Sequence, residues 1–217
     1  MGQQRGFTLV EVLVALSIMA LMGSMSWVGM DALLKSKQRT ESKSIENAQL
    51  QIALGQWASD LEQAWRPDST DPMGWDGKVF RLTRRAQQLE QGVVVVAWAV
   101  RSEGASTDLM RWQSRPVITV GDWQTAWEEA ANWARGSINT PAARLIPADS
   151  VDVYVWHGGT WVNAQSSQVG STTKRSGLGR LAASLPQQPV GVRLVVHTRN
   201  GDLSKDWSAP TWSEPKS

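Results

Sequence analysis

Cysteine is absent from this 217-residue sequence, and charge is absent from a long stretch near its beginning. Without cysteine the chain can form neither a disulfide framework nor a thiolate metal site. The 22 basic and 20 acidic residues nearly cancel, which leaves a net charge of +2. This balance provides no extended basic surface, so nucleic-acid binding is not expected.

Phenylalanine and tyrosine are also scarce, with two and one residues, whereas tryptophan occurs thirteen times. Each tryptophan side chain buries a large area, so we interpret most of them as core residues that replace other aromatics. An aromatic binding surface is the alternative. Trp27 is a candidate for the aromatic belt at a membrane interface.

The uncharged stretch comprises the nineteen residues from Val12 to Met30. As a helix it would be about 28 Å long, close to the thickness of a bilayer's hydrocarbon core. A secretory signal peptide usually has a shorter apolar region of about 7–15 residues. Ser24–Ser26 is a possible cleavage site of that kind, which the residues leave open, but the length favours a transmembrane helix.

One carboxylate, Glu11, lies at the beginning of this apolar stretch. A charge within a transmembrane segment costs about 2–3 kcal/mol or more, depending on its depth. Glu11 therefore either stays hydrated at the headgroup level or requires a cationic partner. Cleavage after Gly6 would free an α-amino group on Phe7, and the amine of a neighbouring chain shifted along the axis could neutralise Glu11. Such a pair would fix the register between subunits.

Residues 6–13, Gly-Phe-Thr-Leu-Val-Glu-Val-Leu, closely resemble the processing motif of type IV pilins and type II secretion pseudopilins. The resemblance implies that a prepilin peptidase cuts between Gly6 and Phe7, removes the leader 1–6, and methylates the new amino terminus. It also implies that Glu11 acts in assembly. Type IV pilins often close a carboxy-terminal disulfide loop, which this cysteine-free chain cannot form.

The charges that flank the apolar stretch do not by themselves give its orientation. Arg5 precedes the stretch as the charge of the leader, whereas Lys35, Lys37 and Arg39 follow it. The positive-inside rule alone would place the carboxy-terminal side in the cytoplasm. The resemblance implies the reverse: a single-pass inner-membrane protein with a cytoplasmic leader and a periplasmic head. We follow the resemblance.

The helix is expected to continue beyond the membrane, because no proline occurs before Pro67 and good helix formers dominate 31–66. Five apolar residues recur there at spacings of four, three, four and four, which predicts one helical stripe that packs on the head. Asp60 and Glu62 lie off this stripe. The five residues are Leu50, Leu54, Trp57, Leu61 and Trp65.

Residues 75–212 are predicted to form a β-rich head. Gly92–Arg101 contains four consecutive valines and is typical of a strand buried on both faces. His157-Gly158-Gly159 and Asn200-Gly201 predict hairpin turns. The other predicted strands are Lys78–Thr83, Leu109–Gln113, Val117–Val120, Val151–Trp156, Thr160–Val162, Val190–Thr198 and Leu203–Trp207.

One helix interrupts the predicted strands, with Asp122 as its N-cap and Gly136 at its end. The polar segment Asn163–Arg180 is expected to be a mobile loop. The predicted fold class is therefore α+β. A long N-terminal helix, transmembrane over 7–30 and then amphipathic, packs on a mostly antiparallel β-sheet head with one short extra helix.

The sequence offers no catalytic or metal-binding pattern. The two histidines, His157 and His197, are about forty residues apart, and no hydrolase, metalloprotease or phosphate-loop motif occurs. Gly177–Ala182 fits GxGxxA but follows a polar stretch and not a strand, so we interpret it as chance. Asp68, Asp71 and Asp76 lack the spacing of a calcium loop and suit a solvated turn. We therefore expect no enzymatic activity, no cofactor and no metal.

Three later features resemble the J-type minor pseudopilin of type II secretion systems. They are the chain length, Asp60-Leu61 before Gln63-Ala64, and a final hairpin that contains Gly201-Asp202-Leu203 after Leu185-Pro186. The resemblance implies a tip complex with I-type and K-type minor pseudopilins. This complex initiates a pseudopilus on the inner-membrane assembly platform and supports export of folded proteins. The K type typically lacks the assembly glutamate, and the I type is usually shorter.

Two other functions stay open at this point. A minor pilin of a type IV pilus, with a role in assembly priming or adhesion, would carry the same N-terminal motif. A tethered periplasmic binding module or enzyme would instead keep its anchor uncut, or be cut near Ser26, and would have a loaded pocket in its head.

Overall fold

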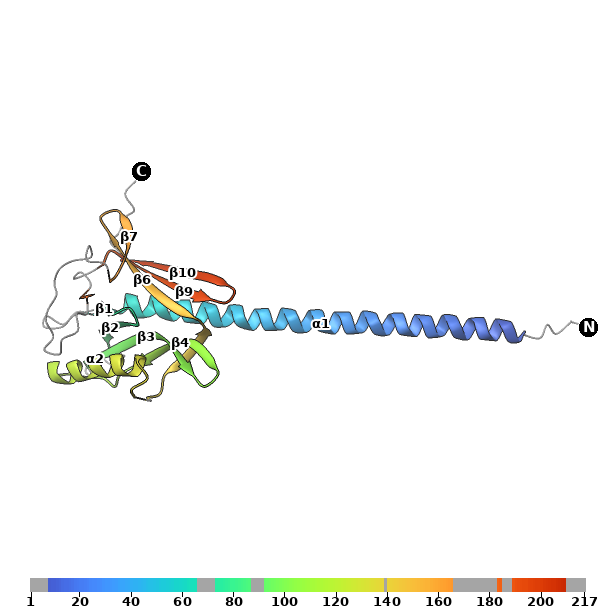
Figure 1. The fold of residues 1–217 in the computed structure, drawn as a ribbon, viewed down its shortest axis with the longest axis horizontal. Coiled ribbons are helices and arrows are strands. Elements are labelled where there is room, and N and C mark those ends of the chain that lie inside the picture. The colour runs from blue at the N-terminus through green and yellow to red at the C-terminus, as the bar shows by residue number, and fades with distance from the viewer. Residues whose placement is uncertain are drawn as a thin grey trace, which may run out of the picture. The chain divides into compact units, whose positions relative to one another are not determined.

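The computed structural model of the protein describes residues 8–65, 73–86, 92–138, 140–165, 183–184 and 189–209. The chain divides into two compact units, Met1–Ala48 and Gln49–Ser217. Helix α1 (Leu9–Glu62) supplies the described part of the first unit and its last turns belong to the second, which we call the head (Figure 1). Every described strand lies in the head.

Helix α1 runs without interruption for 54 residues, as the absence of proline predicts. It ends at Glu62, four residues before the predicted end at Arg66. The reason is that the next residues pair with the sheet: Ala64 forms a bridge with Arg84, and the Trp65 N–H donates to the Thr83 carbonyl oxygen at 2.8 Å. The helix therefore gives way to strand-like pairing before Pro67 is reached.

The larger sheet of the head has six antiparallel strands in the order β5-β4-β3-β2-β1-β8. Strand β3 lies in its interior, and residues 94–99 are buried on both faces, which confirms the prediction from the valine run. The six strands are β1 (Met73–Trp75), β2 (Val79–Arg85), β3 (Val93–Glu103), β4 (Ser106–Gln113), β5 (Ala143–Pro147) and β8 (Ala183–Ser184).

The smaller sheet has four antiparallel strands in the order β10-β9-β6-β7, where β6 is Ser150–His157, β7 Thr160–Asn163, β9 Gly191–Thr198 and β10 Gly201–Ser208. The predicted hairpin turn between β6 and β7 is confirmed: Gly158 and Gly159 have φ values of 58° and 87°, which glycine adopts at little cost. The second hairpin turns one residue earlier than predicted, because Gly201 already pairs with Thr198 as the first residue of β10.

Helix α2 (Val120–Ala134) begins earlier than the sequence predicts. The N-cap is Thr119 and not Asp122: the Thr119 hydroxyl accepts from the Asp122 N–H at 3.1 Å and donates to the Asp122 carboxylate at 2.7 Å. For the same reason Val117–Val120 is no strand, and only Val117 bridges to Val93. Gly136, with φ of 77°, follows the helix end as predicted.

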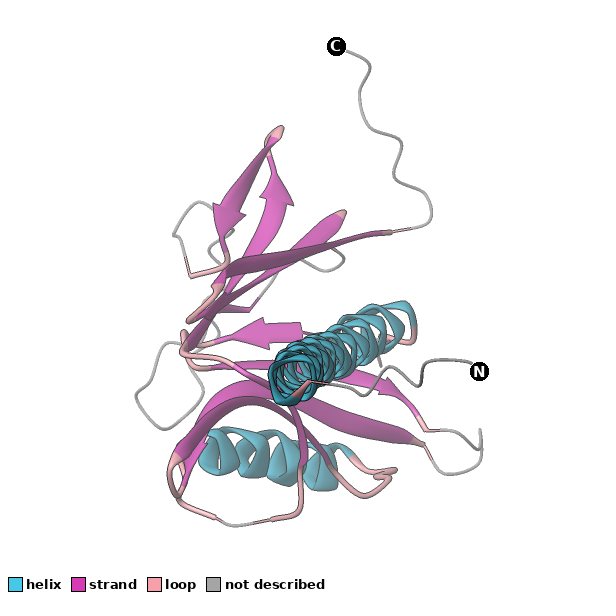
Figure 2. Ribbon diagram, turned by 90° about the vertical axis from the view of Figure 1, so that its right-hand side faces the viewer, coloured by secondary structure: helices cyan, strands magenta, loops and turns pink. Residues whose placement is uncertain are grey.

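Two apolar cores hold the head together. In the first, the last turns of α1 pack with one face of the six-stranded sheet and the inner face of the four-stranded sheet. In the second, α2 covers the opposite face of the six-stranded sheet, as Figure 2 shows. Six tryptophans are buried in these cores, which supports their interpretation as core residues: Trp57, Trp75, Trp98, Trp112, Trp123 and Trp133.

The α+β class is thus confirmed, with a long apolar N-terminal helix, antiparallel sheets and one further helix. The sequence prediction missed β1, β5 and β8, which are short edge or near-edge strands without clear alternation. Most of the expected mobile loop, Leu185-Pro186, Asp68 and Asp71 lie outside the described residues.

Candidate functional site

The described chain begins with a closed network between Thr8 and Glu11. The backbone N–H and the hydroxyl of Thr8 donate to Glu11 Oε2 at 2.9 and 2.8 Å, and the Glu11 N–H donates to the Thr8 hydroxyl at 3.4 Å. This is a capping box, in which two side chains satisfy backbone donors at the helix start. The Glu11 carboxylate is therefore held against the first turn of α1.

The residues of the predicted processing site, Arg5, Gly6 and Phe7, lie outside the described residues. Their roles, and that of Glu11 in assembly, stay predictions. The capping box was not foreseen, although Thr8 and Glu11 have the sequence spacing of such a box.

The first unit contains a helix segment long and apolar enough to cross a membrane, with a mean hydropathy of 2.0. Three serines interrupt the apolar side chains, yet each donates its hydroxyl to a backbone carbonyl three or four residues earlier: Ser17 to Leu13, Ser24 to Leu21 and Ser26 to Met22. Internally satisfied hydroxyls suit a bilayer, where no water replaces a missing partner. The segment is compatible with a single-pass membrane anchor.

Comparison with protein families gives a match over residues 1–27 to the prokaryotic N-terminal methylation motif. This motif indicates a type IV pilin-like protein. It implies processing by a prepilin peptidase and assembly with pilus or pseudopilus machinery. Comparison with curated proteins and with solved structures gives no significant match.

In the head, the chemically most distinctive residue is Asp60, on the last turn of α1. Its carboxylate is fully buried and accepts two close hydrogen bonds from Arg111, at 2.7 and 2.8 Å. Three further donors complete its surroundings: Arg84 Nη1 at 3.2 Å, the Trp98 indole N–H at 2.9 Å and Gln56 Nε2 at 3.1 Å. The buried charge is thereby both paired and hydrogen-bonded, which burial requires.

The Asp60 cluster joins α1 to three neighbouring strands, since Arg84 lies on β2, Trp98 on β3 and Arg111 on β4. Two guanidinium groups face one carboxylate, so one positive charge remains. That charge lies beside the carboxy-terminal turn of α1, whose free carbonyl groups carry partial negative charge. Desolvation by burial lowers the pKa of Arg84, against the opposing effect of Asp60.

The sequence analysis placed Asp60 off the packing stripe, and this was wrong. The residues of α1 that are buried in the head are Ala53, Trp57, Asp60 and Leu61. The missed feature had one detectable sign: Asp60 lies three residues after Trp57, which is also a same-face spacing on a helix.

The five stripe residues have different surroundings. Trp57 and Leu61 are buried in the first core, Leu50 packs at its edge, and Leu54 is half-buried outside it. Trp65 differs most from the expectation, because α1 ends before it. This residue is 39% exposed and its ring lies under the Arg85 guanidinium, 3.6 Å from the ring centroid.

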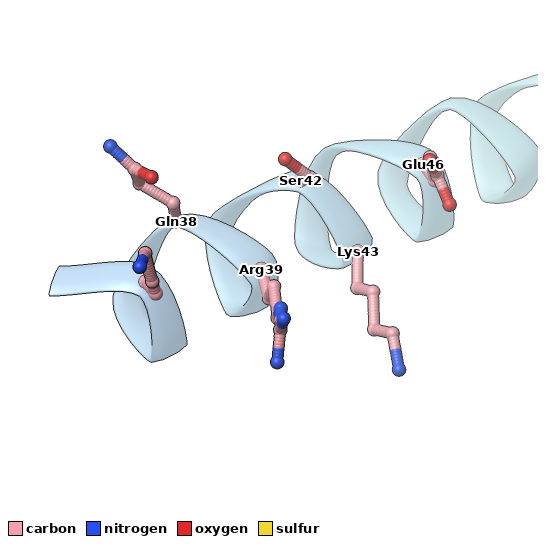
Figure 3. Close-up of a pocket in the computed structure, with 6 residues that line it drawn as sticks. Gln38, Arg39, Ser42, Lys43 and Glu46 are labelled. Carbon is pink, nitrogen blue, oxygen red and sulfur yellow. The ribbon is translucent and has the colours of Figure 1, made fainter. Parts of the chain in front are cut away.

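A shallow hollow lies along the polar part of α1, and Figure 3 shows its lining residues as side chains that project from a single helix. Within the described residues no second element of the first unit faces it. It is therefore an open helix surface and not a ligand site. Its six lining residues are Lys35, Gln38, Arg39, Ser42, Lys43 and Glu46.

The candidate calcium residues give no metal site in the part of the chain that the structure describes. Asp76 accepts from the backbone N–H groups of Lys78 and Val79 at 3.0 and 2.9 Å, and so closes a turn before β2. Its other oxygen lies 3.4 Å from Arg135. Across the described residues, no group of three or more His, Asp or Glu side chains is arranged to hold a metal ion.

Proposed function

We propose that the chain is a minor pseudopilin of a type II secretion system, of the J type. It would be a structural subunit of the tip complex that initiates the pseudopilus and supports export of folded proteins. The observation that carries the pilin-like part of this proposal is the N-terminal methylation motif over residues 1–27, which leads directly into the apolar start of α1. The J type rests on the resemblance in chain length, helix end and final hairpin. The chain is itself not a catalyst in this proposal.

The proposed organisation follows the sequence analysis. Residues 1–6 form a leader that prepilin peptidase removes, 7–30 span the inner membrane, 31–66 continue the helix, and 75–212 form a periplasmic head. The proposed partners are I-type and K-type minor pseudopilins, together with the inner-membrane assembly platform. The Asp60 cluster supports a head in which the end of the helix is fixed firmly to a sheet.

A minor pilin of a type IV pilus is the second candidate, because the same motif supports it equally. Co-purification distinguishes the two. A J-type pseudopilin should be recovered with I-type and K-type pseudopilins when its natural secretion system is expressed. Recovery with pilus subunits alone would favour the second candidate.

The intact mass of the protein extracted from membranes decides whether the chain is processed as a pilin or pseudopilin. The mature chain should begin at an N-methylated Phe7. A natural protein that keeps residues 1–6, or that begins near Ser26, would contradict both candidates.

Replacing Gly6 with valine should block processing almost completely, because the proposed cleavage follows this glycine and valine places a branched side chain at the scissile bond. The intact mass should then equal that of the full 217-residue chain. Gly2→Val is the matched control, since it makes the same change elsewhere in the leader and should leave cleavage unaffected. Normal removal of residues 1–6 from Gly6→Val would contradict the proposed site.

Replacing Glu11 with valine should leave processing intact and reduce recovery of the tip complex by at least about tenfold, because it removes one partner of a charge pair in apolar surroundings. The measurement is the amount of partner subunit that co-purifies with the mature chain. Glu41→Gln, which changes an exposed carboxylate on the same helix, is the control and should assemble normally.

A second variant separates charge pairing from helix capping. Thr8→Val removes the hydroxyl that bonds to Glu11 but keeps the carboxylate. If pairing with a neighbouring amine drives assembly, Thr8→Val should assemble much better than Glu11→Val. Equal losses in the two variants would show that the capping box, and not the ion pair, is what assembly needs.

A further inference from the structure

His197 lies near the end of β9, on the outer face of the four-stranded sheet, with β6 on one side and β10 on the other. Its Nδ1 atom is 2.8 Å from Asp202 Oδ1 on β10, and its Nε2 atom is 3.1 Å from Asp152 Oδ2 on β6. A neutral imidazole has only one N–H, whereas both nitrogens of an imidazolium are donors. Both contacts are therefore hydrogen bonds only when His197 is protonated.

The other charged groups near His197 do not offset these carboxylates. Arg193, on the same face of β9, is held by Asp206 through two bonds of 2.6 and 2.7 Å. On β6 the other titratable side chain of this face is Tyr154, and the backbone N–H of Asp149 donates to the His197 carbonyl oxygen at 2.8 Å. The pKa of His197 is raised, first by the hydrogen bond to Asp202 and then by that to Asp152.

We propose that His197 is a protonation-dependent clasp that fastens the edge strand β10 to β6 across β9. Among the described strands β10 pairs only with β9, so its outer edge has no strand partner. The clasp holds the turn end of β10, where His197 pairs with Asp202. The Arg193–Asp206 pair holds the other end, and its arginine stays charged throughout this pH range.

Loss of the His197 proton weakens only the contacts at the turn end of β10. A neutral His197 keeps at most one donor, and its second nitrogen then presents a lone pair to a carboxylate. Because the folded-state pKa is raised, the stabilisation is complete below the ordinary histidine value of about 6.5. It is lost as the pH rises through the folded-state value. The turn end of β10 should therefore loosen on the alkaline side.

The first test is the titration of His197 in the full chain in detergent, with isotope-labelled histidine followed by NMR. His157→Gln assigns the two histidine signals. The His197 ring should carry protons on both nitrogens at pH 6 and should titrate above the unfolded-state value. Asp202→Asn should lower the midpoint, and Asp152→Asn should lower it less. A midpoint at or below the unfolded-state value, or no shift in either variant, would overturn the clasp.

The second test is amide hydrogen exchange of residues 201–205, normalised for the intrinsic effect of pH. Exchange in the unmodified chain should accelerate by about two- to fivefold as His197 deprotonates, the range for one partly exposed ionic contact. His197→Gln should show no such pH response, whereas His157→Gln, altered at the exposed turn of β6, should retain it. The same pH response in His197→Gln as in the unmodified chain would contradict the inference.

Discussion

Replacing Asp60 with asparagine is expected to lower the free energy of unfolding of the head by about 3–5 kcal/mol, the usual cost of breaking a buried ion pair. The carboxylate is fully buried, and the side chains of Arg84 and Arg111 are only 10% and 12% exposed. Asparagine keeps the size of the side chain but removes its charge and one acceptor. Two nearly buried guanidinium groups would then lose their common counter-ion.

The measurement is denaturant unfolding of the full chain in detergent, followed by tryptophan fluorescence, because the buried tryptophans report on the head. Glu62→Gln is the matched control: it neutralises an exposed carboxylate two residues away and should change stability by less than about 0.5 kcal/mol. A loss in Asp60→Asn no larger than in Glu62→Gln would show that the Asp60 cluster contributes little to the stability of the head.

Replacing Trp57 with alanine should destabilise the head by a similar amount, about 3–5 kcal/mol, through loss of buried area and the cavity left behind. The Trp57 ring is fully buried. It lies against Phe80 at 4.8 Å and edge-on to Trp98 at 5.4 Å between ring centroids. Such contacts add to the effect of burial alone.

Trp57→Phe should cost about half as much or less, because no acceptor for the Trp57 indole N–H occurs among the described residues and phenylalanine therefore sacrifices no hydrogen bond. Trp65→Ala is the second comparison and should cost about 1 kcal/mol or less, since this residue is 39% exposed and its ring stacks on the Arg85 guanidinium. The same unfolding experiment ranks the three variants. A Trp65→Ala loss that equals that of Trp57→Ala would contradict the assignment of the core.

The α+β fold could be predicted because its determinants are local. The absence of proline gives α1 its length, the valine run gives the buried strand β3, and paired glycines give the turn after β6. The residues at which helices and strands begin and end were harder to predict. The end of α1 depends on the bond from the Trp65 N–H to Thr83, which lies eighteen residues later in the chain and gives no local pattern.

The Asp60 cluster shows why polar core residues escape a sequence analysis. An aspartate on a helix is normally assigned to solvent, and its burial depends on Arg84, Trp98 and Arg111, which three separate strands provide. No spacing in the sequence relates these residues. Conversely, the N-terminal motif could be identified because all of its residues are consecutive, and the comparison with protein families matches the same region.

The bonds from Thr8 to Glu11 have a consequence for how subunits would join. In an isolated chain, Glu11 Oε2 already accepts from the backbone N–H and from the hydroxyl of Thr8. Both donors bind Oε2, so the lone pairs of Oε1 are left for the amine of an arriving subunit. The side chain is already held in one position before that amine arrives, so pairing would require little further ordering of the glutamate.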